Sequence, residues 1–352
     1  MKKTIIWTIG GIFFISIWAA LIFSASPTMA SSAKPIELKY SVTEGAQSAR
    51  YKYGHAIWAQ MVEKATNGKV KVTLFPSGSL AAPRQEFDAT VNGIVDIGYM
   101  PLPYYPGRFP LTESLMHPGS NLVTPRMASD VAMKMYQKFP QMQKEFRQVK
   151  FLFMYGFAPI SIATVKEPVR TIEDVKGLRL RVAQKGISDL LKLVGASPMF
   201  IKPHDIFLNL QKGVIDGSVM GWSGHRAFGT NKLAKYFTVV PAFPGPFFIW
   251  MMNKGKWNNL PADVQEAIMS VSGEVGSRHF AKSADKESEI STKDIREDPE
   301  KEIITISKEQ VEKWTEASRP VQETMISKLE SKGLPGRQLF EDVAKMVKAY
   351  GQ

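Results

Sequence analysis

The sequence predicts an α/β fold of two similar lobes, and three observations carry this prediction. Strand-like and helix-like apolar patterns alternate in the order β-α-β-α-β across residues 36–98, which is typical of a parallel sheet covered by helices. Segments 92–98 and 212–217 both carry a glycine, an apolar pair and an aspartate, with Gly93 and Gly213 120 residues apart. The chain has 352 residues with 44% hydrophobic and 22% charged side chains, which is globular composition and enough for two lobes.

The first lobe begins with alternating apolar and polar residues at 36–43, which predict a strand. Residues 50–65 place apolar side chains at helical spacing and stop at Asn67-Gly68. A second alternating strand spans 69–75, and a short helix spans 83–92 with proline in its first turn.

Later elements repeat this alternation less regularly. A long helix enters at Pro261 and runs from about 260 to 291. The expected strands are 149–155, 161–166, 178–182, 247–253 and 300–306, and the other expected helices are 187–193, 204–211, 308–332 and 337–350. We expect lobe 1 to comprise residues 31–157 plus about 247–285. Lobe 2 should comprise 158–246, with the C-terminal helices of about 286–352 packing on it and between the lobes.

Residues 1–30 have the pattern of a signal peptide. Two lysines precede an uncharged apolar run at 5–23, and small residues follow, with cleavage predicted after Ala30 or Ala33. An uncleaved membrane anchor is the alternative, since 19 apolar residues nearly suffice to cross a bilayer. Both alternatives predict export of the folded part.

The composition excludes several classes of function. Without cysteine the chain has no disulfide, thiol nucleophile or cysteine-ligated metal. The net charge is +12, but the basic residues are scattered, so we predict attraction for small anions and no nucleic-acid partner.

No catalytic set is evident in the sequence. No two of the five histidines have metal-ligand spacing, so no metal or cofactor is expected. The segment 221–225 resembles a nucleophile elbow but carries His225 where the second glycine belongs. An exported chain with two lobes, a ligand cleft between them and no catalytic set is predicted to be a solute receptor.

Five segments in order then resemble one family. Residues 171–182, 194–198, 210–217, 253–267 and 67–77 resemble the signatures of DctP-type solute-binding proteins of TRAP (tripartite ATP-independent periplasmic) transporters. The resemblance implies a two-lobed periplasmic binding protein fold with a long bent helix spanning both lobes. It also implies a periplasmic receptor that closes over an organic anion and docks on small and large membrane subunits. A monomer is implied, with dimers in some relatives, and an exported hydrolase or a sensory receptor are the alternatives from other classes.

The resemblance assigns the ligand clamp to Arg181, because a guanidinium forms two parallel charge-assisted bonds with a carboxylate. Arg179 ranks second because it lies further from the carboxyl end of the strand. Gln184 stands where relatives often carry a ligand-binding asparagine.

Other predicted site residues differ from those that sugar-acid receptors of this family carry. Met220 stands where sialic-acid receptors carry an asparagine, and apolar residues replace other polar groups. The predicted lining residues are Tyr99, Tyr104, Met220, Trp222, Phe247 and Phe248, with one of the two phenylalanines facing away. Thr43 and Glu44 could add polar contacts from a lobe 1 loop. We therefore predict a monocarboxylate with an apolar or aromatic body, and a C4-dicarboxylate or a sugar acid as the alternatives.

Overall fold

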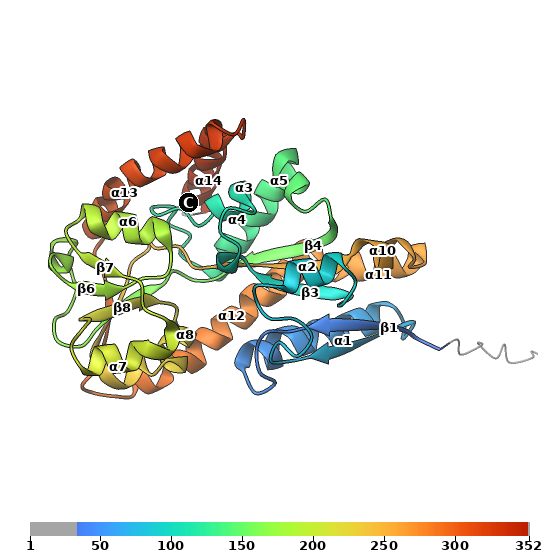
Figure 1. The fold of residues 1–352 in the computed structure, drawn as a ribbon, viewed down its shortest axis with the longest axis horizontal. Coiled ribbons are helices and arrows are strands. Elements are labelled where there is room, and N and C mark those ends of the chain that lie inside the picture. The colour runs from blue at the N-terminus through green and yellow to red at the C-terminus, as the bar shows by residue number, and fades with distance from the viewer. Residues whose placement is uncertain (1–33, 351–352) are drawn as a thin grey trace, which may run out of the picture. The chain divides into compact units, whose positions relative to one another are not determined.

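The computed structural model describes residues 34–350, which form two β-sheets with helices on their faces (Figure 1). The first sheet has the order β2-β1-β3-β10-β4, and the second has the order β11-β9-β5-β8-β6-β7. We call each sheet with its covering helices lobe 1 and lobe 2. The strands are β1 (Ile36–Ser41), β2 (Val70–Phe75), β3 (Ile97–Pro101), β4 (Val149–Gly156), β5 (Ser161–Thr164), β6 (Arg179–Arg181), β7 (Ser197–Met199), β8 (Gly217–Met220), β9 (Tyr236–Val239), β10 (Phe247–Asn253) and β11 (Glu302–Thr305).

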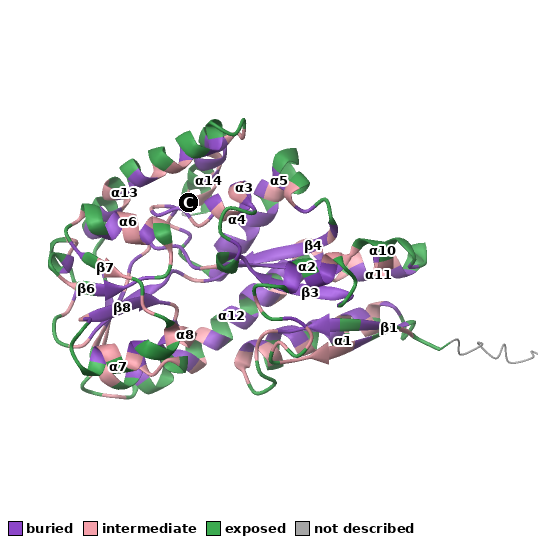
Figure 2. Cartoon of the chain, viewed as in Figure 1, coloured by how far each residue is buried: buried purple, intermediate pink, exposed green. Residues whose placement is uncertain are grey.

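Helices cover both sheets, and the strands beneath them are largely buried (Figure 2). The α-helices are α1 (Ala56–Ala65), α2 (Glu86–Val91), α3 (Pro110–Ser114), α4 (Pro125–Lys138), α5 (Pro140–Glu145), α6 (Lys185–Leu193), α7 (Ile206–Gln211), α8 (Trp222–Ala227), α9 (Thr230–Leu233), α10 (Lys254–Asn258), α11 (Ala262–Ser270), α12 (Gly273–Arg296), α13 (Lys308–Glu330) and α14 (Gly336–Tyr350). Within the described residues, no helix is both long and apolar enough to cross a membrane.

The sheets are mixed, whereas the strand and helix alternation predicted parallel ones. Strands β1, β2 and β3 are parallel as expected, but β10 runs antiparallel to both β3 and β4. In lobe 2, β5 is likewise antiparallel to β8 and β9. Each reversed strand directly follows a strand-to-strand crossing from the other lobe, whereas β11, which follows α12, is parallel to β9.

The repeat seen in the sequence is a repeated structural element. Gly93 and Gly213 follow α2 and α7 with positive φ angles of 73° and 66°, a conformation that glycine adopts without strain. The Asp96 carboxylate accepts from the backbone N–H of Lys39 at 2.8 Å, and the Asp216 carboxylate accepts from that of Arg179 at 2.8 Å. The same turn therefore fixes a neighbouring strand in each lobe.

Two chain crossings join the lobes. Residues 157–160 connect β4 to β5, and residues 240–246 connect β9 to β10. The crossings are hydrogen-bonded through Phe157 N to Pro246 O at 2.9 Å and Ile160 N to Phe243 O at 3.1 Å. A Cβ on Gly245 would lie 2.1 Å from the carbonyl oxygen of Ala158, so only glycine permits this approach.

The long helix expected at 260–291 is present as two helices with a bend. Helix α11 ends at Ser270, and α12 begins at Gly273, whose φ is +52°. Helix α12 packs against β4 and α4 in lobe 1 and against α8 and β11 in lobe 2 (Figure 1). It therefore spans both lobes.

Candidate ligand-binding site

Arg181 is the last residue of β6, and its side chain is 7% exposed. Its backbone pairs with Ser218 of β8 and Met199 of β7, which places it between β8 and the edge strand of the lobe 2 sheet. The Nε group donates to the carbonyl oxygen of Ile201 at 3.1 Å. No carboxylate among residues 34–350 lies within ion-pair distance of this guanidinium, so both Nη groups have no described anionic partner.

Arg179 provides a direct contrast two residues earlier. Its Nη2 group lies 2.7 Å from Asp216 Oδ1, and its Nε donates to Oδ2 at 3.0 Å. This bidentate ion pair neutralises Arg179 and ties it to its own lobe. Of the two arginines on β6, only Arg181 retains an uncompensated positive charge.

Burial of Arg181 without a counterion has an electrostatic cost. Desolvation lowers the pKa of the guanidinium, and only the nearby Tyr104 phenol opposes the shift. Tyr104 follows β3 in lobe 1, so the two lobes approach each other at this arginine. An organic carboxylate bound here would compensate the buried charge.

Gln184 lies three residues further along the chain, at the N-cap of α6. Its side-chain oxygen is buried and has no hydrogen-bond donor among the described residues. A buried amide oxygen without a donor loses its solvation, so it would gain from a ligand that supplies an N–H or O–H.

The wall of lobe 1 carries a charge cluster, which we define as Glu44, Arg50, Tyr99 and Glu287. Arg50 donates to both oxygens of Glu287 at 3.0 and 3.1 Å, and its Nη1 donates to Glu44 at 2.7 Å and to the Tyr99 hydroxyl at 2.9 Å. Tyr99 in turn donates to Glu44 at 2.8 Å. Glu287 comes from α12, so this cluster ties the lobe-spanning helix to the loop after β1.

Glu44 stays ionised inside this cluster. Burial by itself would raise its pKa, but Arg50 and a contact with His55, whose Nε2 lies 3.5 Å away, together hold the pKa far below its usual range. Burial lowers the pKa of His55, so the imidazole is largely neutral at pH 7. Thr43 donates to the second oxygen of Glu44 at 3.1 Å, so the two predicted loop residues contact each other.

Aromatic rings pack around the charge cluster. Phe248 stacks on Tyr99 with centroids 5.6 Å apart and an interplanar angle of 9°, and the Arg50 guanidinium lies 4.5 Å above the Phe248 ring. Phe247 points to the opposite face of the sheet, where it packs with Ala128 of α4 around Gly156. The structure therefore places Tyr99 and Phe248 together and separates Phe247 from them.

The remaining predicted lining residues are Trp222, Met220 and Tyr104. Trp222 packs in a lobe 2 cluster with Phe237 and Ile295, and Met220 packs in another with Ile206 and Leu210. Tyr104 is 44% exposed beside Arg181. Of the ten residues predicted for the site, Thr43, Glu44, Tyr99 and Phe248 lie in or against the charge cluster, and Tyr104 lies beside Arg181.

Sequence reasoning missed Arg50 and Glu287. Arg50 precedes a π-helical turn, Tyr51–His55, where the sequence predicted an α-helix from residue 50, and this turn leads into α1. A charged residue just after the first loop of an α/β unit was the available signal for Arg50. Glu287 gave no local signal, because it lies 237 residues from its partner in the chain.

Ser161 and His225 form a buried pair that sequence spacing did not predict. The Ser161 Oγ lies 3.0 Å from His225 Nε2, and both residues are almost fully buried. Burial lowers the pKa of His225 to about 3. Such a weak base, whose Nδ1 has no described partner, is poorly suited to activate a hydroxyl, so the pair is structural.

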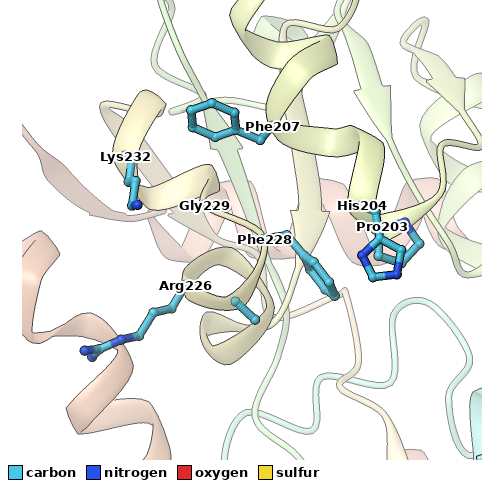
Figure 3. A pocket seen from close by; sticks show the side chains of 8 residues that line it. Pro203, His204, Phe207, Arg226, Phe228, Gly229 and Lys232 are labelled. Atoms are coloured by element: carbon cyan, nitrogen blue, oxygen red, sulfur yellow. The ribbon is translucent and has the colours of Figure 1, made fainter.

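One surface pocket of lobe 2 has a volume of about 370 Å³ (Figure 3). It lies beside α7, α8 and α9, and its lining includes none of the predicted site residues. Figure 3 shows Phe207 and Phe228 on its apolar side and Arg226 and Lys232 on its basic side.

Three proteins illustrate what this chain is similar to. A marine metagenome TRAP solute-binding protein, described as specific for aromatic acid ligands and crystallised with 3-hydroxybenzoate, superposes with a TM-score of 0.80 at 23% identity, covering 91% of this chain and 100% of that one. A TRAP solute-binding protein from Rhodoferax ferrireducens with copurified benzoate gives a TM-score of 0.78 at 22% identity, covering 90% and 98%. A monocarboxylate 2-oxoacid-binding periplasmic protein of Nostoc is 28% identical over 227 residues, which are 61% of this chain and 60% of that protein.

The family itself follows from a match along most of the chain. The profile described as "Bacterial extracellular solute-binding protein, family 7", or DctP, matches residues 41–329. That range includes the whole lobe 2 sheet, the lobe 1 sheet apart from residues 36–40 of β1, and every residue of the site described above. The chain belongs to the DctP family of bacterial extracellular solute-binding proteins.

Proposed function

We propose that this protein is the periplasmic receptor of a TRAP transporter and binds an organic monocarboxylate through Arg181. The observation that carries the proposal is the buried Arg181 guanidinium, which has one neutral acceptor and no described counterion. A bidentate carboxylate would supply the missing charge and two hydrogen bonds.

The body of the ligand is apolar or aromatic. Phe248 retains a small exposed surface in lobe 1 and stacks on the fully buried Tyr99, and rings of this kind bury large apolar area with defined geometry. The similar proteins that hold 3-hydroxybenzoate and benzoate, and the relative named for monocarboxylate 2-oxoacids, support this ligand class. A C4-dicarboxylate or a sugar acid remains the alternative ligand.

The family and the predicted signal peptide support a role in the periplasm. The predicted signal peptide lies outside the described residues, and it would deliver the receptor to the periplasm. There the monomeric receptor closes over its ligand by a shift between open and closed forms, then passes it to the small and large membrane subunits.

The test is a binding screen on the protein lacking residues 1–30. Thermal shift and calorimetry should compare benzoate, mandelate and branched 2-oxo acids with C4-dicarboxylates and sugar acids. Ligand at about 1,000 times Kd stabilises by about 4 kcal/mol, which shifts the melting temperature by several degrees. Selective binding of monocarboxylates is expected, whereas binding of sugar acids alone would overturn the proposed ligand class.

A further inference from the structure

The charge cluster of lobe 1 bears a net negative charge. It contains two carboxylates, Glu44 and Glu287, and a single guanidinium, Arg50. The phenol of Tyr99 stays neutral, because burial raises its pKa well above the usual value. Two negative groups against one positive group leave one negative charge in excess.

Arg50 cannot serve as a second carboxylate clamp in this arrangement. Its guanidinium carries five N–H groups. Four of them already point to Glu287, Glu44 and the Tyr99 hydroxyl. The aromatic rings of Phe248 and Phe157 lie at 4.5 and 5.3 Å from its central carbon. A ligand carboxylate would have to displace a protein carboxylate that is already bound.

The cluster and Arg181 lie near the same crossing between the lobes. Phe157 lies beside Arg50, and Ser161 lies beside His225. The two residues are four positions apart in the chain, a length that spans at most about 14 Å when extended. Arg181 is close enough to His225 to lower its pKa further. Tyr104 of lobe 1 lies beside Arg181, and Tyr99 of the charge cluster lies five positions earlier in the same segment. The far end of an acid held by Arg181 is therefore taken to face lobe 1.

Glu44 is the part of the cluster that a ligand can meet. Its side chain is 19% exposed, whereas that of Glu287 is 9% exposed behind Arg50. We propose that Glu44 is a specificity-determining residue, whose fixed negative charge excludes ligands that carry a second anionic group. This inference rests on the proposed function, because it assumes that Arg181 holds the first carboxylate.

The physical basis is repulsion in a partly desolvated site. A second carboxylate placed toward lobe 1 would lose its hydration and meet a like charge at low effective dielectric. A neutral or aromatic end would instead contact Phe248, which stacks on the buried Tyr99, at no electrostatic cost. The site is polarised, with a positive group in lobe 2 and a negative group in lobe 1.

The experiment compares matched ligand pairs that differ by one carboxylate, benzoate with isophthalate and butyrate with succinate. Calorimetry measures the four affinities for wild type, Glu44→Gln, Arg181→Ala and Glu37→Gln. Glutamine at position 44 keeps the shape and can still accept from Arg50 and Tyr99. Glu37 is an exposed residue of β1, so Glu37→Gln removes one charge from the same lobe away from the site.

We define the preference as the Kd of the dicarboxylate divided by the Kd of the matched monocarboxylate. Glu44→Gln should lower this ratio at least tenfold, mainly because the dicarboxylate binds more tightly. Glu37→Gln should leave that preference unchanged, and Arg181→Ala should weaken all four acids. Glu287→Gln removes the other negative charge and should narrow the preference less, which provides a second variant if Glu44→Gln melts early.

Three results would overturn the inference in distinguishable ways. An unchanged preference in folded Glu44→Gln would show that its charge is not the discriminating element. Wild type that binds the dicarboxylates at least as tightly would refute the exclusion and leave the receptor role intact. Wild type that binds neither member of either pair, and neither mandelate nor a branched 2-oxo acid, would refute the proposed monocarboxylate class and this inference with it.

Discussion

Replacement of Arg181 tests the site most directly. Among the described residues its guanidinium makes one hydrogen bond, to the carbonyl of Ile201, and no ion pair. Arg181→Ala therefore removes a buried charge that nothing in the described protein compensates. The lost hydrogen bond and the relieved desolvation oppose each other, so we expect the melting temperature to change by less than about 3 °C.

Ligand binding should respond far more strongly. A bidentate carboxylate makes two charge-assisted hydrogen bonds, each contributing about 1.5–3 kcal/mol. Their loss amounts to about 3–6 kcal/mol, or roughly 10²–10⁴-fold in Kd at about 1.4 kcal/mol per factor of ten. Arg181→Lys keeps the charge without the fork, so its affinity should lie between those of wild type and alanine.

Calorimetry with the best ligand from the screen measures these affinities, and a melting curve of each unliganded variant checks the fold. Arg179→Ala is the matched control, because Arg179 lies on the same strand but is exposed and paired with Asp216. Its loss should leave affinity unchanged. If folded Arg181→Ala bound the ligand within threefold of wild type, the assignment of the clamp would be wrong.

Three further predictions concern stability. Gly245→Ala should destabilise the protein by about 1–3 kcal/mol in denaturant unfolding, since its Cβ would lie 2.1 Å from the Ala158 carbonyl oxygen; an unchanged midpoint would contradict the close crossing. Glu287→Ala leaves Arg50 buried with one carboxylate fewer, so it should lower the free energy of unfolding by about 3–5 kcal/mol. A decrease of less than about 1 kcal/mol would show that this ion pair does not stabilise the fold. Burial raises the pKa of Glu86 to about 8, against the opposing hydrogen bond from Ser41, so the folded state binds a proton that the unfolded state releases near pH 4.5. Its contribution to stability is present below that pH and is lost as pH rises toward 8, by up to about 1.4 kcal/mol per pH unit. Relative to wild type, Glu86→Gln should therefore gain stability from pH 5 to 8 in parallel urea titrations, and a constant difference would refute the shift.

Alternating apolar and polar residues, together with turn residues, predicted most strands, because both patterns depend only on neighbours along the chain. The strand at 36–43 and that at 69–75 appear as β1 and β2, and the glycine stops at 93 and 213 end α2 and α7. Strands β7 and β9 were not predicted. The direction of β5 and β10 was not predicted either, because it depends on how the chain crosses between the lobes.

For the site, the sequence by itself determined the family, the fold class and the arginine pair on β6. Which arginine is free was decided by tertiary structure, since Asp216 arrives from another turn to neutralise Arg179 and no described acid reaches Arg181. The charge cluster likewise exists only in the folded chain, where α12 brings Glu287 to Arg50 across 237 positions. Periodicity reports the neighbours of a residue along the chain, whereas charge compensation in a site depends on neighbours in space.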